Sequence, residues 1–123
     1  MIKKFEKYNK IKVIKDYYYP SDKIKYKSYY FGKLRHREDG PSYQEWHENG
    51  QKKYEIWYLN GKLHKEGGPS IQHWYENGKK IYEEWYLNDK IYSRDEWVEE
   101  LKRIGSPHYR EQKMLLNMEK YNI

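Results

Sequence analysis

The sequence predicts a mainly β fold: a single-layer antiparallel array of β-hairpins with a 28-residue period, capped by one or two C-terminal α-helices. Three observations predict it. A block of aromatic and turn residues occurs twice at this spacing, Asn-Gly dipeptides divide each block into two short aromatic runs, and a helical pattern begins after the second block. Repetition at a fixed period marks units that bury their apolar faces by stacking on their neighbours.

Two full copies of the block begin at Gly40 and at Gly68. The first contains Gly40-Pro41-Ser42, Trp46, Glu48-Asn49-Gly50, Lys52, Tyr54-Glu55 and Trp57-Tyr58. The second contains Gly68-Pro69-Ser70, Trp74, Glu76-Asn77-Gly78, Lys80, Tyr82-Glu83 and Trp85-Tyr86. At 123 residues we expect one domain, with a degenerate repeat over 1–28, the repeats over 29–92 and a helical cap over 93–123.

Each block reads as a pair of strands joined by a tight turn. Asn49-Gly50 and Asn77-Gly78 lie between β-forming runs, which predicts type I′ hairpin turns with positive φ at both central residues. Asn60-Gly61 opens the longer connection to the next block, and Pro69 starts the next strand. Alternation places Trp57 on one face of the sheet and Tyr54 on the other, so both faces carry rings.

The last thirty residues change to a helical pattern. Ser93 and Glu96 form a predicted capping box, and a stripe of apolar residues follows from Trp97 until Gly105 ends the helix. Ser106-Pro107 then predicts a second helix that begins at this pair and runs to about Lys120. These helices either cover the open end of the sheet or mediate oligomerisation and partner docking.

Composition limits the class of protein. Only 37% of residues are hydrophobic and 36% are charged, but 19% are aromatic, including 16 Tyr and 5 Trp, so we expect a thin aromatic core. The absence of Cys excludes disulfides and thiolate metal sites, and no signal peptide or transmembrane run is evident, which predicts a cytoplasmic protein. The net charge of +6, concentrated in residues 1–37, reflects either an anionic partner or AT-rich codon usage.

The run from Trp57 to Pro69 resembles the MORN-like repeats found in large DNA viruses, bacteriophages and some bacteria. Gly32 to Pro41 resembles the same motif with one residue inserted, and the likeness covers about residues 18–92. The regular Tyr-x-Gly-x-Trp steps of the better-known MORN pattern are missing, so phospholipid binding is not implied. The resemblance implies an elongated hairpin array for binding or scaffolding, in the host cytoplasm or the virion if the protein is viral.

No motif predicts catalysis. His36 and Glu38 recur as His64 and Glu66, and two such pairs on neighbouring loops could hold a metal. A residue that recurs with its scaffold is usually structural, for example a His bonded to a loop carbonyl. The deaminase signature also needs cysteines that this chain lacks. We therefore predict no catalytic residue, no metal and no cofactor.

Two function classes remain. The first is a non-enzymatic adaptor that binds another protein through exposed rings, because Tyr, Trp and Arg are enriched at interaction hot spots. The second is a nucleic-acid binder that stacks bases on rings and tracks phosphates with the Lys-rich N-terminal segment, although acidic residues spread through the repeats oppose it. For the adaptor, the predicted binding residues are Tyr43, Trp46, Tyr54, Trp74, Tyr75 and Tyr82, with Arg35 and Arg37 at the rim.

Overall fold

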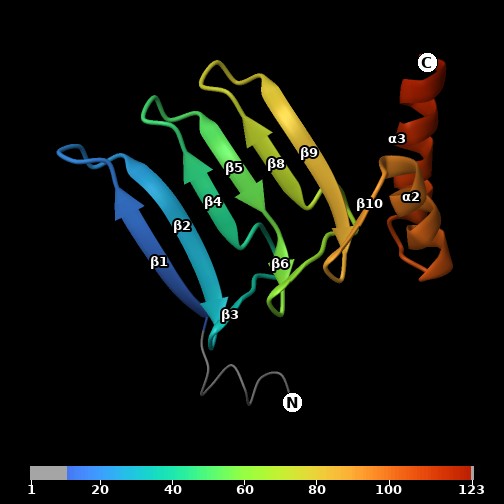
Figure 1. The fold of residues 1–123 in the computed structure, drawn as a ribbon, viewed down its shortest axis with the longest axis horizontal. Coiled ribbons are helices and arrows are strands. Elements are labelled where there is room, and N and C mark those ends of the chain that lie inside the picture. Colours follow the sequence, from blue (N-terminus) through green and yellow to red (C-terminus); the bar gives the residue numbers. More distant parts are fainter. Residues whose placement is uncertain (1–10, 123) are drawn as a thin grey trace.

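A computed structural model describes residues 11–122, which form an eight-stranded antiparallel sheet, a separate two-stranded hairpin and two C-terminal helices (Figure 1). The strands are β1 (Ile11–Tyr17), β2 (Ile24–Phe31), β3 (Leu34–Arg35), β4 (Tyr43–Trp46), β5 (Lys52–Ile56), β6 (Tyr58–Leu59), β7 (Lys62–Leu63), β8 (Ile71–Trp74), β9 (Lys80–Leu87) and β10 (Lys90–Tyr92). The helices are α2 (Arg94–Arg103) and α3 (Tyr109–Tyr121). The mainly β class with C-terminal helices is confirmed.

The strands lie side by side in nearly the order in which the chain forms them. The main sheet has the order β1-β2-β4-β5-β8-β9-β10, with β3 paired to β2, and β6 and β7 form a separate small hairpin. Figure 1 shows one layer, with β1 at one edge and the helices beside the other. The order follows from the turn signals, since hairpins place consecutive strands next to each other.

The prediction of type I′ turns at Asn49-Gly50 and Asn77-Gly78 is wrong. Gly50 and Gly78 both have φ of +89°, but neither preceding Asn has a positive φ. Gly50 N–H donates to the His47 carbonyl over 2.9 Å and His47 N–H donates to the Gln51 carbonyl over 2.8 Å, which closes a three-residue loop with Gly in the left-handed region. Pairs of consecutive residues with positive φ instead occur at Asn60-Gly61, which join β6 to β7, and at Asn88-Asp89, which join β9 to β10.

Corresponding hydrogen bonds occur at positions 28 residues apart. The Oγ of buried Ser42 accepts from Tyr58 N–H at 2.9 Å, and the Oγ of buried Ser70 accepts from Tyr86 N–H at 3.1 Å. The register of β4 with β5 shifts after Glu45, and that of β8 with β9 shifts after His73. Each serine lies just before the first strand of a hairpin and bonds to the chain at the end of that hairpin's second strand, so it closes the open end of the hairpin.

The first helix forms as the sequence predicts. Ser93 Oγ accepts from Glu96 N–H and the Glu96 carboxylate accepts from Ser93 N–H, which completes the capping box. The start predicted for the second helix is wrong, because α3 begins at Tyr109. Ser106 Oγ accepts from His108 N–H at 3.2 Å, so it caps a turn that precedes the helix.

The hydrophobic core lies where the helices meet the end of the sheet. Its buried residues are Leu87, Trp97, Val98, Leu101 and Leu116, with Trp85, Tyr92 and Tyr109 packed against them. Trp97 Nε1 donates to the Lys65 carbonyl at 3.2 Å, and Gln112 Nε2 donates to the Gly67 carbonyl at 3.1 Å. Both helices therefore attach to the loop before β8, and α2 also packs against β9. No helix in the described residues is long and apolar enough to cross a membrane.

Candidate functional site

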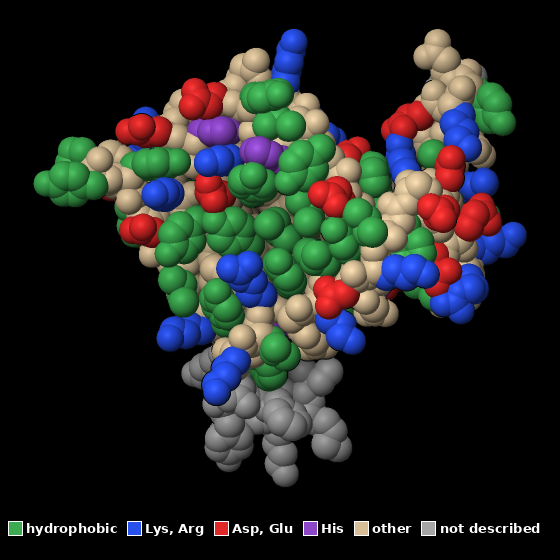
Figure 2. Space-filling model, in the orientation of Figure 1, with side chains coloured by type: hydrophobic (Ala, Val, Ile, Leu, Met, Phe, Trp, Pro, Cys, Tyr) green, Lys and Arg blue, Asp and Glu red, His purple; other side chains and the backbone are tan. Residues whose placement is uncertain are grey.

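Strand register sorts the rings of the sheet onto two faces. Tyr54 lies opposite His73, and His73 lies opposite Tyr82, so these side chains project from the same face. We call this side the tyrosine face, defined by Tyr26, Tyr43, Tyr54, His73 and Tyr82. We call the other side the tryptophan face, defined by Trp46, Trp57, Trp74 and Trp85. Figure 2 looks onto the tyrosine face, where hydrophobic side chains form a band across the strands.

The rings of the tyrosine face contact each other across strands. Tyr54 and His73 stack with ring centroids 3.9 Å apart and an interplanar angle of 12°. Tyr82 meets His73 edge-on at 5.4 Å, and Tyr26 stacks on Tyr43 at 6.1 Å. Offset and edge-on aromatic pairs add to the stabilisation from burial. The result is a stiff row of rings that is only half-buried, with Tyr82 41% exposed.

Charged groups lie within and beside this row of rings. The Arg35 guanidinium carbon lies 5.3 Å from the Tyr43 ring centroid and 5.5 Å from that of Tyr58. Tyr43 Oη donates to Glu45 at 2.6 Å, and Glu45 forms an ion pair with Lys53 at 3.1 Å. Burial, helped by the hydrogen bond to Glu45, raises the pKa of Tyr43 well above its usual range, so the phenol stays neutral.

The surroundings lower the pKa of both Glu45 and His73, so they favour the charged carboxylate of Glu45 and the neutral ring of His73. Burial opposes ionisation of Glu45, but hydrogen bonds from Tyr43 and Lys53 outweigh it and lower its pKa. Burial also lowers the pKa of His73, and the positive charge of Lys53 acts in the same direction. His73 Nδ1 is buried without a hydrogen-bond partner among the described residues. Glu45 pairs in register with both Tyr26 and Tyr54, so the ion pair lies within the tyrosine face. It separates the uncharged cluster of Tyr54, His73 and Tyr82 from the stacked rings of Tyr26 and Tyr43.

The tryptophan face is covered by cations and by the helices. Lys65 Nζ lies 4.1 Å above the Trp57 ring, and the Arg37 guanidinium carbon lies 4.2 Å above Tyr29. Arg94 lies over Trp85, which also packs against Trp97 of α2. Burial lowers the pKa of Lys65, as expected for an ammonium group held against an indole ring. All four indole rings therefore have a Lys or Arg over them, whereas on the tyrosine face only Tyr43 does among the described residues.

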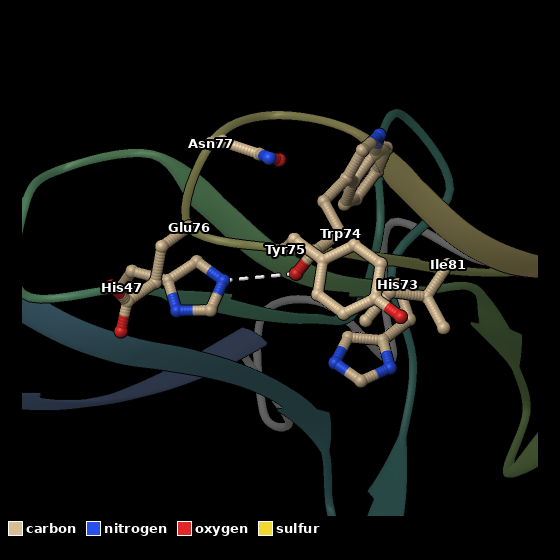
Figure 3. A pocket seen from close by; sticks show the side chains of 7 residues that line it. All are labelled: His47, His73, Trp74, Tyr75, Glu76, Asn77 and Ile81. Carbon is tan, nitrogen blue, oxygen red and sulfur yellow. Dashed lines mark hydrogen bonds between the residues drawn. The ribbon is translucent and has the colours of Figure 1, made fainter.

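A shallow depression of about 500 Å³ lies at the tip of the β8–β9 hairpin. Figure 3 shows its lining, which is His47, His73, Trp74, Tyr75, Glu76, Asn77 and Ile81. His47 Nε2 donates to the Trp74 carbonyl at 2.9 Å, which ties the two hairpin tips together. Tyr75 is 54% exposed beside it. The depression extends the tyrosine face towards the hairpin tips.

The two His-Glu pairs have structural contacts. His36 Nδ1 accepts from Asn60 N–H at 2.8 Å, and His64 Nδ1 accepts from Asn88 N–H at 3.1 Å. His64 Nε2 lies 3.1 Å from the Glu66 carboxylate, whose pKa is lowered first by a hydrogen bond from Ser106 and then by His64. The sequence predicts that such a His bonds to a loop carbonyl, but each of these His rings instead accepts a hydrogen bond from a loop N–H. Within residues 11–122 no three His, Cys, Asp or Glu side chains are grouped as a metal site requires.

The structure brings together only part of the predicted binding set. Tyr43, Tyr54, Tyr82 and Arg35 lie on or beside the tyrosine face, and Tyr75 lies next to its depression. The other predicted residues are on the tryptophan side. Lys27 covers Trp46, Lys52 covers Trp74, and Arg37 covers Tyr29.

Sequence reasoning missed His73, which joins Tyr54 to Tyr82. Its counterpart in the preceding block is Glu45, so the repeat pattern gave no reason to select it. The signal that could have found it is alternation, because His73 precedes Trp74 and must project from the opposite face. Comparisons with protein-family models, with curated proteins and with solved structures find no match for this chain. The resemblance to MORN-like repeats stays a prediction.

Proposed function

We propose that this protein is a non-enzymatic adaptor that binds another protein through the tyrosine face. The observation that carries the proposal is the difference between the two faces. Rings on both faces are half-buried, but each ring of the tryptophan face has a Lys or Arg over it, whereas Tyr54, His73 and Tyr82 have none among the described residues and Tyr82 is 41% exposed. Tyr and Arg supply much of the binding energy at protein interfaces, because rigid rings bury large areas at a small entropic cost.

The scaffold of this adaptor is proposed to be a repeat array with a 28-residue period, of the MORN-like kind. The equivalent serine hydrogen bonds of Ser42 and Ser70, and the equal φ of Gly50 and Gly78, support this reading. We also propose that the protein acts in the cytoplasm. A viral origin is part of the proposal because repeats of this MORN-like kind are common in large DNA viruses and bacteriophages. The array would act as a rigid platform rather than as a catalyst.

A nucleic-acid-binding function is the alternative, and one observation favours it: Lys12 and Lys15 are exposed on β1. The acidic Glu45 and Glu84 lie within or beside the tyrosine face and would repel a phosphate backbone laid along it. The two functions differ in salt dependence, since phosphate binding weakens steeply as counterions are released. Binding to single-stranded and duplex oligonucleotides is therefore measured at about 50 and about 200 mM salt.

Tight, steeply salt-dependent binding that is lost on reversing Lys3, Lys10, Lys12 and Lys15 would overturn the adaptor function. Lys3 and Lys10 lie outside the described residues.

The adaptor function is tested by affinity capture from native cells after nuclease treatment, with three forms of the protein. The wild type and a Tyr121→Ser variant should capture the same protein, because Tyr121 is 70% exposed on α3, far from the tyrosine face. Tyr82→Ser removes an exposed ring of that face and should reduce capture by about tenfold or more, as for a hot-spot residue. Equal capture by Tyr82→Ser would place binding elsewhere, and loss of all captured protein after nuclease would favour the alternative.

A further inference from the structure

The two edges of the sheet differ in what covers them. At one end, β9 and β10 are covered by the helical core. At the other end, β2 is the one strand among residues 11–122 that pairs with β1, and all seven residues of β1 are exposed. Four of them are large and apolar: Ile11, Val13, Ile14 and Tyr17. An edge strand of this length is a template for pairing with another strand.

The backbone groups that β1 presents outwards follow from its pairing with β2. Tyr29 N–H donates to the Ser42 carbonyl, and the Tyr29 carbonyl accepts from His36 N–H, so Tyr29 hydrogen-bonds away from β1. In an antiparallel ladder alternate residues bond to opposite sides. Ser28 therefore faces β1, and its partner Ile14 faces β2. The outward backbone groups belong to Ile11, Val13 and Lys15. The alternation ends there, because the register shifts after Asp16 and Tyr17 N–H donates to the Asp16 carboxylate at 2.9 Å.

We propose that two copies of this chain pair through their β1 strands, antiparallel and about a twofold axis at Ile14. This register matches Val13 with Lys15 of the second copy, both of which present free backbone groups. It also sets Lys12 opposite Asp16 of the second copy, and the twofold axis repeats the pair. In an isologous interface each such contact is made twice. The two sheets then form one continuous sheet across the dimer.

Charge selects this register. Lys12 and Asp16 fall in a non-hydrogen-bonded pair, where opposed Cα atoms are only about 4.5 Å apart and side chains meet most closely. Within one chain the two residues are four positions apart on the strand, roughly 13 Å, so they cannot pair with each other. An edge that only avoided pairing would carry like charges. Here the charges are complementary when β1 meets itself, and the exposed Ile14 side chains then meet at the axis.

The test measures the mass of the full chain in solution from about 5 to about 200 µM by light scattering and sedimentation velocity. The wild type should be a dimer with a micromolar Kd, because a seven-residue edge is smaller than a standard interface. Lys12→Glu and Asp16→Lys should each raise Kd by about tenfold or more, since each sets like charges opposite one another twice. Lys79→Glu makes the same charge change on the β8–β9 loop and should leave Kd unchanged.

Mixing the two charge variants gives the decisive result. A Lys12→Glu chain and an Asp16→Lys chain should form a mixed dimer of near wild-type affinity, because both cross-strand pairs are then complementary. Circular dichroism of each variant alone checks that it is folded. A wild type that stays monomeric over this concentration range would overturn the proposal. A dimer that ignores both substitutions, or variants that fail to recombine, would also overturn it.

Discussion

At the scale of single residues, the surroundings of His73 disfavour its protonated form. Its ring stacks on Tyr54, its Nδ1 has no partner among the described residues, and its pKa lies below the ordinary 6.5 because of burial and the nearby charge of Lys53 and His47. Only Glu45 acts in the opposite direction. A neutral ring fills this position well, so protonation should weaken the centre of the tyrosine face.

This environment predicts that acid destabilises the protein through His73. Between the lowered folded pKa and the unfolded value of 6.5, the unfolded chain binds more protons, so stability falls as pH falls through this range. His73→Phe keeps a ring between Tyr54 and Tyr82 but cannot take up a proton. Its melting temperature should fall less than that of the wild type between about pH 7.5 and about pH 5.5.

Tyr82→Phe is the control, because it changes the same row of rings and retains His73. The lowered pKa of Glu45 affects stability only below the ordinary carboxylate value of 4.5, outside this range. If His73→Phe and Tyr82→Phe lose equal stability on acidification, His73 is not the responsible group.

At the scale of elements, the hairpin tips depend on one backbone conformation. Gly50 and Gly78 both have φ of +89°, a region that costs little for Gly and is strained for a β-branched residue. A Cβ at Gly50 would meet no atom within 4 Å, so the strain comes from the backbone and not from a clash. A substitution at Gly50 therefore tests backbone strain without a packing clash.

Gly50→Val and Gly78→Val should each lower the free energy of unfolding by about 1–3 kcal/mol, the usual cost of forcing a non-glycine residue into this region. Thermal and urea unfolding measure the change. Gln51→Val is the matched control, since Gln51 is the next residue in the hairpin, is exposed and has no positive φ. A Gly50→Val variant as stable as Gln51→Val would show that the loop relaxes into another turn.

Among these elements, some features follow from residues close together in the sequence and others do not. The capping box of α2 was predicted to the residue, because Ser93 and Glu96 satisfy each other's backbone within one turn. The turn class at Asn49-Gly50 was not, because the register shift after Glu45 lengthens the loop by one residue. Such a shift depends on how two strands meet, and the dipeptide alone carries no information on it.

At the scale of the whole molecule, stability is expected to be uneven. The buried core contains Leu87, Trp97, Val98, Leu101 and Leu116, all at the helical end. The β1–β2 hairpin has only exposed residues on β1 and no comparable core. Regions with few buried apolar contacts open with a smaller free energy than the core. The array should therefore open progressively from β1 towards the helices.

Hydrogen exchange followed by mass spectrometry, at a concentration well below the dimer Kd, should show the fastest strand amides in β1 and the slowest in β9 and α2. Trp97 is fully buried, so Trp97→Ala should lower the free energy of unfolding by about 3–5 kcal/mol. The slowly exchanging amides of β9 and α2 should then exchange faster. Tyr121→Ala, at a 70% exposed position of α3, should leave the pattern unchanged. Uniform protection along the sheet would contradict this uneven stability.

The sequence by itself determined the β class, the positions of the hairpins and the helix that follows Ser93. These depend on turn, capping and alternation signals between residues close in the chain, which act before any distant contact forms. It also determined that His36 and His64 serve equivalent structural roles, although not that they accept from loop N–H groups.

Only the tertiary structure decided which rings share a face and where the core lies. Trp46 and Trp74 were grouped with Tyr54 and Tyr82 from the repeat, yet their side chains project from the opposite side of the sheet. A strand position one residue away points to the other face, and the partner it meets is set by cross-strand register. Register joins residues far apart in the chain, so the tyrosine face exists only once the strands have paired.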